Sequence, residues 1–292
     1  MSNFSDFISG GGNASQVNET IDINSTANLI TLADGRVYLK GGVTESDTAT
    51  YPDATANLAY SGFTFSVGSQ DGEPAGVTSD GSYLWVLGAN SGAVYKYSMA
   101  GVYQNVSFSV GSQTGGNVDD VMWDGSHFWV VSNSNDAVYK YNASGVYQNV
   151  SFSVASQMGV PRGIAWDGTY FYVVDQSSDR AYKYNAGGTY QNVSFVVADS
   201  PQGIAYDGSH LWVISVTTQK LHQYTTAGVA TGLEISTASL GSNPSGVGND
   251  GTTLYTTDRI IDNVFKFQNQ VGVVSETGTP LTQGKQNYVR IK

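Results

Sequence analysis

The pattern of apolar and polar positions repeats five times along the middle of the chain. The copies share an Asp-Gly pair, an aromatic-rich apolar run and a polar loop; four of the five also have a small-Gly-apolar segment, and four have a strand in which aromatic residues flank Lys. The pairs begin at Asp80, Asp124, Asp167, Asp207 and Asp250, at spacings of 44, 43, 40 and 43 residues. Short apolar runs at this period predict four strands per copy, here called a to d, with Asp-Gly as the a–b hairpin turn. The chain is therefore predicted to be all-β, with each repeat forming one blade of a β-propeller.

A segment ahead of the first repeat has the pattern of a strand d. Phe63–Val67 matches Val106–Val110, and Gly-Ser-Gln follows both segments. The fifth repeat becomes irregular after its strand c, so we predict that residues 60–67 complete the last blade and close the ring, leaving no open sheet edge. This gives five blades. Six blades are the alternative, because Asp34–Leu39 is one more hairpin-like unit.

The two ends of the chain do not follow the repeat. Short strands are expected at Thr20–Ile23, Asn28–Leu32, Arg36–Leu39 and Asn287–Lys292. Ring closure brings both ends to the same blade, so we expect them to form a small β-rich base. The predicted domains are an attachment and base segment at 1–59, the propeller at 60–274 and a C-terminal strand at 275–292 that packs with the base.

Composition limits the classes of function. Charged residues make up 13% of the 292 residues, with 13 Lys and Arg scattered along the chain and a net charge of −11, so nucleic-acid binding is disfavoured. The absence of Cys excludes disulfides and thiolate metal sites. The N-terminal residues lack a signal-peptide pattern, and no apolar stretch is long enough to cross a bilayer. We therefore expect a protein made in a cytoplasm, neither secreted nor inserted in a membrane.

Two repeats open with a motif of a known repeat family. Pro161–Asp167 and Pro201–Asp207 both read Pro-x-Gly-Ile-Ala-x-Asp. The blade pattern, over residues 60–270, resembles the NHL family and its bacterial lyase-like relatives. That resemblance implies a propeller fold but no particular activity, because propellers host unrelated functions.

The ends of the chain carry a second resemblance. Asp34–Val43, Thr50–Ala54 and Tyr288–Lys292 resemble the ends of tail or fibre proteins of tailed bacteriophages. The resemblance implies that the ends attach to a virion and that the propeller is a displayed module. It also implies other virion proteins as partners, a host-surface saccharide as a ligand, and a homo-oligomer in the particle.

Candidate binding residues come from positions where the repeats differ. The d–a loops, which join adjacent blades, and the b–c loops should surround one mouth of the central channel. At the start of strand a the repeats hold Ala75, Asp119, Arg162, Gln202 and Ser245. From these and the b–c loops we select Asp119, Arg162, Gln202, Asp175 and Asp258 as a binding site for a polar ligand. Solvated loops without a ligand are the alternative.

The aromatic residues before three of the Asp-Gly turns form a second candidate. Trp123, Trp166 and Tyr206 stand where the other two repeats have Ser79 and Asn249. Symmetry does not require three adjacent aromatic residues, so a contact patch on the opposite face is predicted. The equivalent aromatic residues of strand b are expected to be core. The three His residues occupy positions that other repeats fill with Tyr or Thr, so we expect no metal and no cofactor.

No arrangement of catalytic residues is visible in the spacing. The first hypothesis is therefore a non-enzymatic virion protein, such as a tail fibre, that displays a propeller. The alternatives are a propeller enzyme, a lyase or glycan hydrolase, that uses the channel mouth, and an intracellular protein-interaction propeller.

Overall fold

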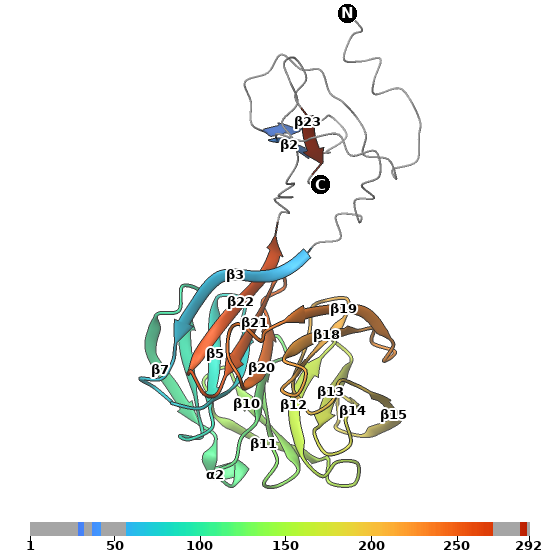
Figure 1. The fold of residues 1–292 in the computed structure, drawn as a ribbon. Helices are drawn as coiled ribbons and strands as arrows, with labels where there is room; N and C mark the ends of the chain where they lie inside the picture. Colours follow the sequence, from blue (N-terminus) through green and yellow to red (C-terminus); the bar gives the residue numbers. More distant parts are fainter. Residues whose placement is uncertain (1–28, 32–36, 42–56, 271–286, 291–292) are drawn as a thin grey trace, which may run out of the picture. The chain divides into compact units, whose positions relative to one another are not determined.

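The computed structural model describes residues 29–31, 37–41, 57–270 and 287–290 (Figure 1). Contacts divide the chain into two units, Leu58–Gln268 and a second unit formed by Met1–Asn57 with Asn269–Lys292. The larger unit is a β-propeller of five four-stranded antiparallel sheets, as predicted. No helix among the described residues is long and apolar enough to cross a membrane.

Four blades take their strands a to d in chain order, from the inner strand outward, and the fifth takes its outer strand from the segment before blade one. Blade one consists of β4 (Pro74–Ser79), β5 (Tyr83–Gly88), β6 (Ala93–Ser98) and β7 (Tyr103–Ser109), and blade two of β8 (Asp120–Trp123), β9 (His127–Ser132), β10 (Ala137–Asn142) and β11 (Tyr147–Ser153). Blade three consists of β12 (Pro161–Trp166), β13 (Tyr170–Asp175), β14 (Arg180–Asn185) and β15 (Tyr190–Val196), and blade four of β16 (Pro201–Tyr206), β17 (Leu211–Ser215), β18 (Lys220–Tyr224) and β19 (Ala230–Ser236). Blade five consists of β20 (Pro244–Asn249), β21 (Thr253–Asp258), β22 (Asn263–Gln270) and β3 (Asn57–Ser66). The four-residue helix α2 (Gly111–Thr114) lies between blades one and two.

The N-terminal strand β3 closes the ring, which confirms the prediction. It is the outer strand of blade five, where Thr64 Oγ1 donates to the carbonyl of Val264 at 2.9 Å and the amide of Val67 donates to the carbonyl of Asp262 at 2.8 Å. Gly62 has a φ of +82°, and Asn105, Asn149 and Asn192 have φ near +55° at the equivalent point of their strands. Gly and Asn tolerate this left-handed conformation. The recurring Asn-Val-Ser sequence is therefore associated with a kink in strand d.

The smaller unit contains one described sheet. It joins β1 (Leu29–Thr31), β2 (Val37–Gly41) and β23 (Asn287–Arg290), and β2 pairs antiparallel with both neighbours. Segments from both ends of the chain thus share a sheet. The hairpin-like unit at Asp34–Leu39 contributes part of β2 to this sheet, so the described residues form five blades and the six-blade alternative is wrong. The expected strand at Thr20–Ile23 lies outside the described residues.

The Asp-Gly turns also anchor the core. In every blade the turn Asp accepts hydrogen bonds from the backbone and from the strand-b aromatic residue; Trp129 Nε1, for example, donates to Asp124 at 2.7 Å and Tyr172 Oη to Asp167 at 2.9 Å. The five equivalent aromatic residues, Trp85, Trp129, Tyr172, Trp212 and Tyr255, are at most 4% exposed. The N–H or O–H group of a large buried aromatic ring needs such a hydrogen-bond acceptor. These aromatic residues are core, as predicted.

The innermost strands approach so closely that four blades have Gly at the third position of strand a. A Cβ on Gly163 would lie 2.7 Å from the Cα of Gly203, and one on Gly246 would lie 2.6 Å from the Cα of Gly76. In the remaining blade, blade two, Asp120 takes the place of this Gly, and it is fully buried. Its carboxyl accepts hydrogen bonds from the amides of Val121 at 2.9 Å and Ile164 at 3.0 Å.

Candidate functional site

The loop mouth of the channel is defined here by Glu73, Asp119, Arg162, Gln176, Gln202 and Arg259. These residues come from the starts of inner strands, from d–a loops and from b–c loops of all five blades. Short inner strands in mutual contact bring these segments together. The d–a and b–c loops thus meet at one end of the channel, as expected.

Asp119 is the centre of this cluster. It is 3% exposed and accepts hydrogen bonds from Arg162 Nη1 at 2.5 Å, from the backbone N–H of Asn133 at 3.0 Å and from the side-chain Nδ2 of Asn133 at 3.3 Å. Burial raises the pKa of Asp119 above its ordinary value, and the Arg162 guanidinium opposes that shift. Two of the predicted residues, Asp119 and Arg162, are therefore in direct contact across two blades.

Arg162 continues the network toward blade four. Its Nε donates to Gln176 Oε1 at 2.9 Å, and Gln176 Nε2 donates to Ser200 Oγ at 2.9 Å. Gln202 occupies the equivalent position on β16 and is 8% exposed. On this side of the mouth, hydrogen bonds thus fix the side chains of Arg162, Gln176 and Ser200 relative to one another.

Arg259 and Glu73 form the other side of the mouth. Arg259 follows β21 in blade five, and its Nη2 lies 3.9 Å from Asp119 Oδ1 in blade two. Its Nη1 lies 3.5 Å from Glu73 Oε1. Blade one lies between blades five and two, and at the repeat position of Asp119 it has the small residue Ala75. Burial lowers the pKa of Arg259, and the neighbouring Asp119 carboxylate opposes this.

Asp120 lies next to this cluster, inside the ring of innermost strands. Burial raises the pKa of Asp120 well above its ordinary value, and the two backbone amides that bind its carboxyl lower it. Because Asp120 has no exposed surface, it does not meet a ligand in this conformation. It places a proton-binding group beside Asp119.

Asp175 and Asp258 each join the b–c loop of their blade to the d–a loop that precedes that blade. Asp175 accepts hydrogen bonds from the amides of Gly159, Val160 and Ser178 and from the hydroxyls of Ser177 and Ser178. These bonds lower the pKa of Asp175 against the effect of burial. Asp258 accepts from the amides of Asn243, Ile260 and Ile261. These bonds occupy the oxygens of both carboxylates, which are at most 2% exposed. Their role in a ligand site stays a prediction.

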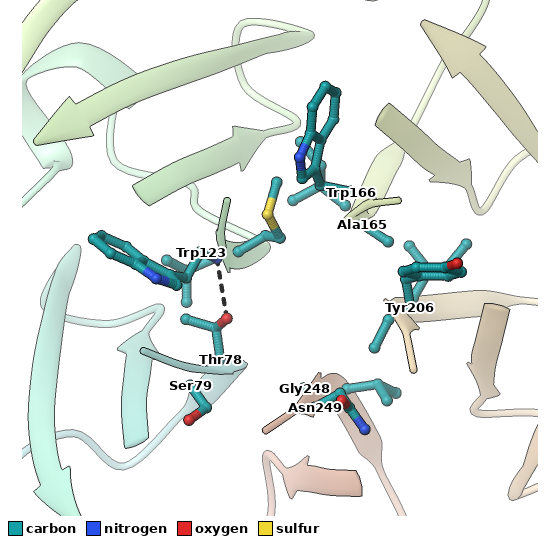
Figure 2. A pocket seen from close by; sticks show the side chains of 14 residues that line it. Thr78, Ser79, Trp123, Ala165, Trp166, Tyr206, Gly248 and Asn249 are labelled. Atoms are coloured by element: carbon teal, nitrogen blue, oxygen red, sulfur yellow. Dashed lines mark hydrogen bonds between the residues drawn. The ribbon is translucent and has the colours of Figure 1, made fainter. Parts of the chain in front are cut away.

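The opposite end of the channel, the turn mouth, is ringed by Ser79, Trp123, Trp166, Tyr206 and Asn249. It opens into a pocket of about 60 Å³, lined deeper by Thr78, Met122, Ala165, Ala205 and Gly248. In Figure 2 the rings of Trp123, Trp166 and Tyr206 spread outward from the pocket. Trp123 packs on Phe128 with ring centres 4.6 Å apart, and Trp166 packs on Phe171 at 4.4 Å.

The three aromatic residues are therefore half-buried and cover the ends of their blades rather than converging on one point. Thr78 Oγ1 accepts the backbone amide of Trp123 at 3.0 Å, which links blades one and two at this mouth (Figure 2). Packing on strand-b Phe residues covers part of Trp123 and Trp166, and Tyr206 packs on the cluster that contains Leu211. Their role as a contact patch stays a prediction.

Sequence reasoning did not select Glu73, Gln176, Asp120 or Arg259. For Asp120 a signal was present, because blade two has Asp-Asp where the other blades have x-Gly at the start of strand a. Arg259 was visible only as one of several diverging b–c loop residues, and Glu73 gave no signal, since their contacts join blades that are distant in the chain. Among the described residues no group of three or more His, Asp or Glu is arranged to hold a metal ion.

Comparisons with known proteins identify the fold. Glutaminyl cyclase from Myxococcus xanthus matches with a TM-score of 0.58 and 8% identity, over 70% of this chain and 94% of that one. Virginiamycin B lyase from Staphylococcus aureus matches with a TM-score of 0.44 and 18% identity over 82% and 79% of the two chains. The PQQ-bound aldose sugar dehydrogenase from Streptomyces coelicolor matches with a TM-score of 0.48 and 11% identity over 75% and 99%.

No protein family and no curated protein matches the sequence itself. The structural matches agree with the propeller fold that the NHL resemblance implied. They also correct the expectation that the chain is not an enzyme, because glutaminyl cyclase, which matches with a TM-score of 0.58, is an enzyme with this fold. Spacing alone could not exclude an enzyme, since groups on different blades meet only after folding.

Proposed function

We propose that the propeller is an enzyme that acts on a polar saccharide at the loop mouth, as a lyase or a glycan hydrolase. The observation that supports this is Asp119, a nearly buried carboxyl with a raised pKa that lies between two guanidinium groups from other blades. Perturbed carboxyl groups in a charged, partly dry site are typical of general acid–base catalysis.

Asp119 and Glu73 are the proposed acid–base pair. Both carboxylates lie around the guanidinium of Arg259, and glycosidases place their two carboxyl groups roughly 5 to 9.5 Å apart. Glu73 is 40% exposed and has access to solvent, whereas Asp119 is nearly dry. In glycosidases two carboxyl groups in different surroundings divide the roles, one donating a proton while the other accepts one.

The two reactions use this pair differently. In hydrolysis one carboxyl protonates the leaving oxygen while the other takes a proton from water, whose oxygen bonds to the sugar carbon as the glycosidic bond breaks. In elimination a carboxylate takes a proton from a carbon, the C–H electrons form a C=C bond, and the neighbouring C–O bond breaks. The leaving oxygen then receives a proton from the acid.

The test is incubation of the full chain with a panel of neutral and acidic polysaccharides. Hydrolysis yields new reducing ends only, whereas elimination also yields unsaturated products that absorb ultraviolet light. Asp119→Asn and Glu73→Gln should each abolish most of the product, and Glu234→Gln, a carboxyl on the exposed strand β19, should not. Equal activity of all four proteins, or none of them acting on any member of the panel, would count against an enzyme at this mouth.

We also propose that the smaller unit attaches the chain to a virion, with other virion proteins as partners and a host-surface saccharide as the substrate. The resemblance of Asp34–Val43 and Tyr288–Lys292 to phage tail proteins supports this, and both ends contribute to one sheet. We further propose that the chain is made in the host cytoplasm and forms a homo-oligomer in the particle. Deletion of residues 1–12 should prevent incorporation into particles while the propeller still folds; normal incorporation would show that this peptide is not the tether.

A further inference from the structure

The guanidinium of Arg259 has no hydrogen-bonded partner among the described residues. Its Nε is buried without an acceptor, and its terminal nitrogens lie 3.5 Å from Glu73 and 3.9 Å from Asp119. Hydrogen bonds from nitrogen to oxygen span about 2.7–3.2 Å, so these are loose ion pairs. The side chain is nevertheless only 16% exposed.

The other two Arg side chains that the structure describes have hydrogen-bond acceptors. Arg162 makes short bonds to Asp119 and Gln176, and Arg180 donates to the hydroxyl and the carbonyl of Ser194. A buried charged donor that lacks its bonds is costly, and in native proteins it calls for an acceptor from outside the chain. Within the part of the chain that the structure describes, Arg259 is thus the one cation at the loop mouth whose guanidinium N–H groups have no hydrogen-bond acceptor.

The charges around Arg259 restrict what that ligand is. Two guanidinium groups and the carboxylates of Asp119 and Glu73 leave the mouth with no net charge when both acids are ionised. A phosphate monoester would bring a larger negative charge next to both carboxylates, whereas a sulfate ester carries one charge on oxygens that are arranged as a tetrahedron. A carboxylate carries one charge, and its two oxygens match the fork of a guanidinium in a bidentate pair.

We propose that Arg259 binds the carboxylate of a hexuronic acid unit, so that the substrate at the loop mouth is an acidic polysaccharide. This inference rests on the proposed function and narrows it. A carboxylate held by a guanidinium makes the C–H bond next to it easier to ionise, because the cation stabilises the charge that develops there. Elimination is then favoured over hydrolysis, with Asp119 or Glu73 as the group that accepts the proton.

The experiment measures binding and turnover separately. Calorimetry of the full chain is carried out with trimers of several hexuronic acids and with their carboxyl-reduced neutral counterparts. The acidic trimers should bind, and reduction of their carboxyl groups should weaken binding by about tenfold or more, the loss of one good charged contact. Arg259→Met should produce a loss of the same size for acidic trimers and no change for neutral ones.

Two further variants provide controls. Arg180→Met removes an Arg whose donors are already satisfied on blade three and should leave binding unchanged. Arg259→Lys keeps the charge without the fork, and it should bind acidic trimers more weakly than the wild type and more tightly than Arg259→Met. A circular-dichroism melting curve for each variant verifies that the propeller is folded.

The outcomes separate this inference from the proposed function. Turnover of neutral glycans with no preference for acidic ones would overturn the carboxylate inference and leave the enzyme proposal standing. Binding of acidic trimers that depends on Arg259, without turnover, would support the carboxylate site and contradict the enzyme. Binding of no acidic trimer, or binding that Arg259→Met does not change, would overturn the inference.

Discussion

The loop mouth and the turn mouth are built from opposite ends of the same five inner strands, yet they differ in character. Strand β8 begins beside Asp119 and ends with Trp123. At its start the repeats place charged groups that bind one another across blades, and at its end they place rings that lie over the same blade's own core. Divergence among repeats is therefore not sufficient to identify a site. What distinguishes the loop mouth is that its diverging residues meet.

The largest expected effect is on turnover at the loop mouth. Asp119→Asn keeps the shape and the acceptor oxygen but removes the proton-binding group, so the rate should fall by roughly 10²–10⁴. Trp166→Ala at the turn mouth should change the rate much less. The measurement is initial velocity on the best polysaccharide of the panel. A greater loss from Trp166→Ala than from Asp119→Asn would reverse the assignment of the two mouths.

Removal of Arg162 should mainly cost stability. Arg162→Ala leaves the nearly buried Asp119 without its shortest cationic contact, and breaking one side of such a pair typically costs about 3 kcal/mol. This exceeds the small cost expected for an exposed loop residue. Urea unfolding gives the value, with Arg180→Ala as the matched control. A change below about 0.5 kcal/mol would show that Arg259 or solvent replaces Arg162 beside Asp119.

Truncation at the turn mouth should reduce stability without affecting ligands. Trp166→Ala removes the ring that packs on Phe171 and should cost roughly 2 kcal/mol, less than a fully buried Trp. Trimer binding at the loop mouth should be unchanged in the same calorimetry. If Trp166→Ala left the unfolding free energy intact and abolished saccharide binding, the aromatic residues would be a contact patch after all.

The last expected effect is a dependence of stability on pH, and it is the smallest when it is counted per pH unit. The folded state holds the pKa of Asp120 well above its ordinary value of 3.8, so folding favours the protonated group and stability is lost as pH rises above that value. Asp120→Gly restores the residue of the other four blades and removes this dependence. The stability of the wild type relative to the variant should fall by at most about 1.4 kcal/mol per pH unit. Urea unfolding between about pH 4 and 8 tests this, and parallel curves for the two proteins would contradict it.

The fold was predictable because each of its determinants is local. An Asp-Gly turn, a strand-b aromatic residue and a strand-d kink recur within one repeat, and Phe63–Val67 carries enough of that pattern to reveal ring closure. Asp119 and Arg162 were also accessible, because they occupy one repeat position with different chemistry.

The rest of the site depended on tertiary contacts. Arg259 reaches Asp119 from blade five across blade one, and no spacing in the sequence encodes that distance. Asp175 and Asp258 were selected because acidic residues in b–c loops suggest ligand contacts. In the folded chain, backbone amides of these b–c loops and of the adjoining d–a loops occupy their oxygens. Loop carboxylates followed closely by Ser or by free backbone amides are better read as turn-stabilising groups.

Ring closure by β3 has a mechanical consequence. Val67 pairs with Asp262 and Thr64 with Val264, so β3 enters and β22 leaves at the same end of an antiparallel pair. Tension applied between the two ends of the propeller segment would open these bonds one after another, as in unzipping, instead of loading them all together. Synthesis has a similar limit, because β3 cannot pair until residues about 200 positions later have been made. The fifth blade is therefore the last to assemble and the first to yield.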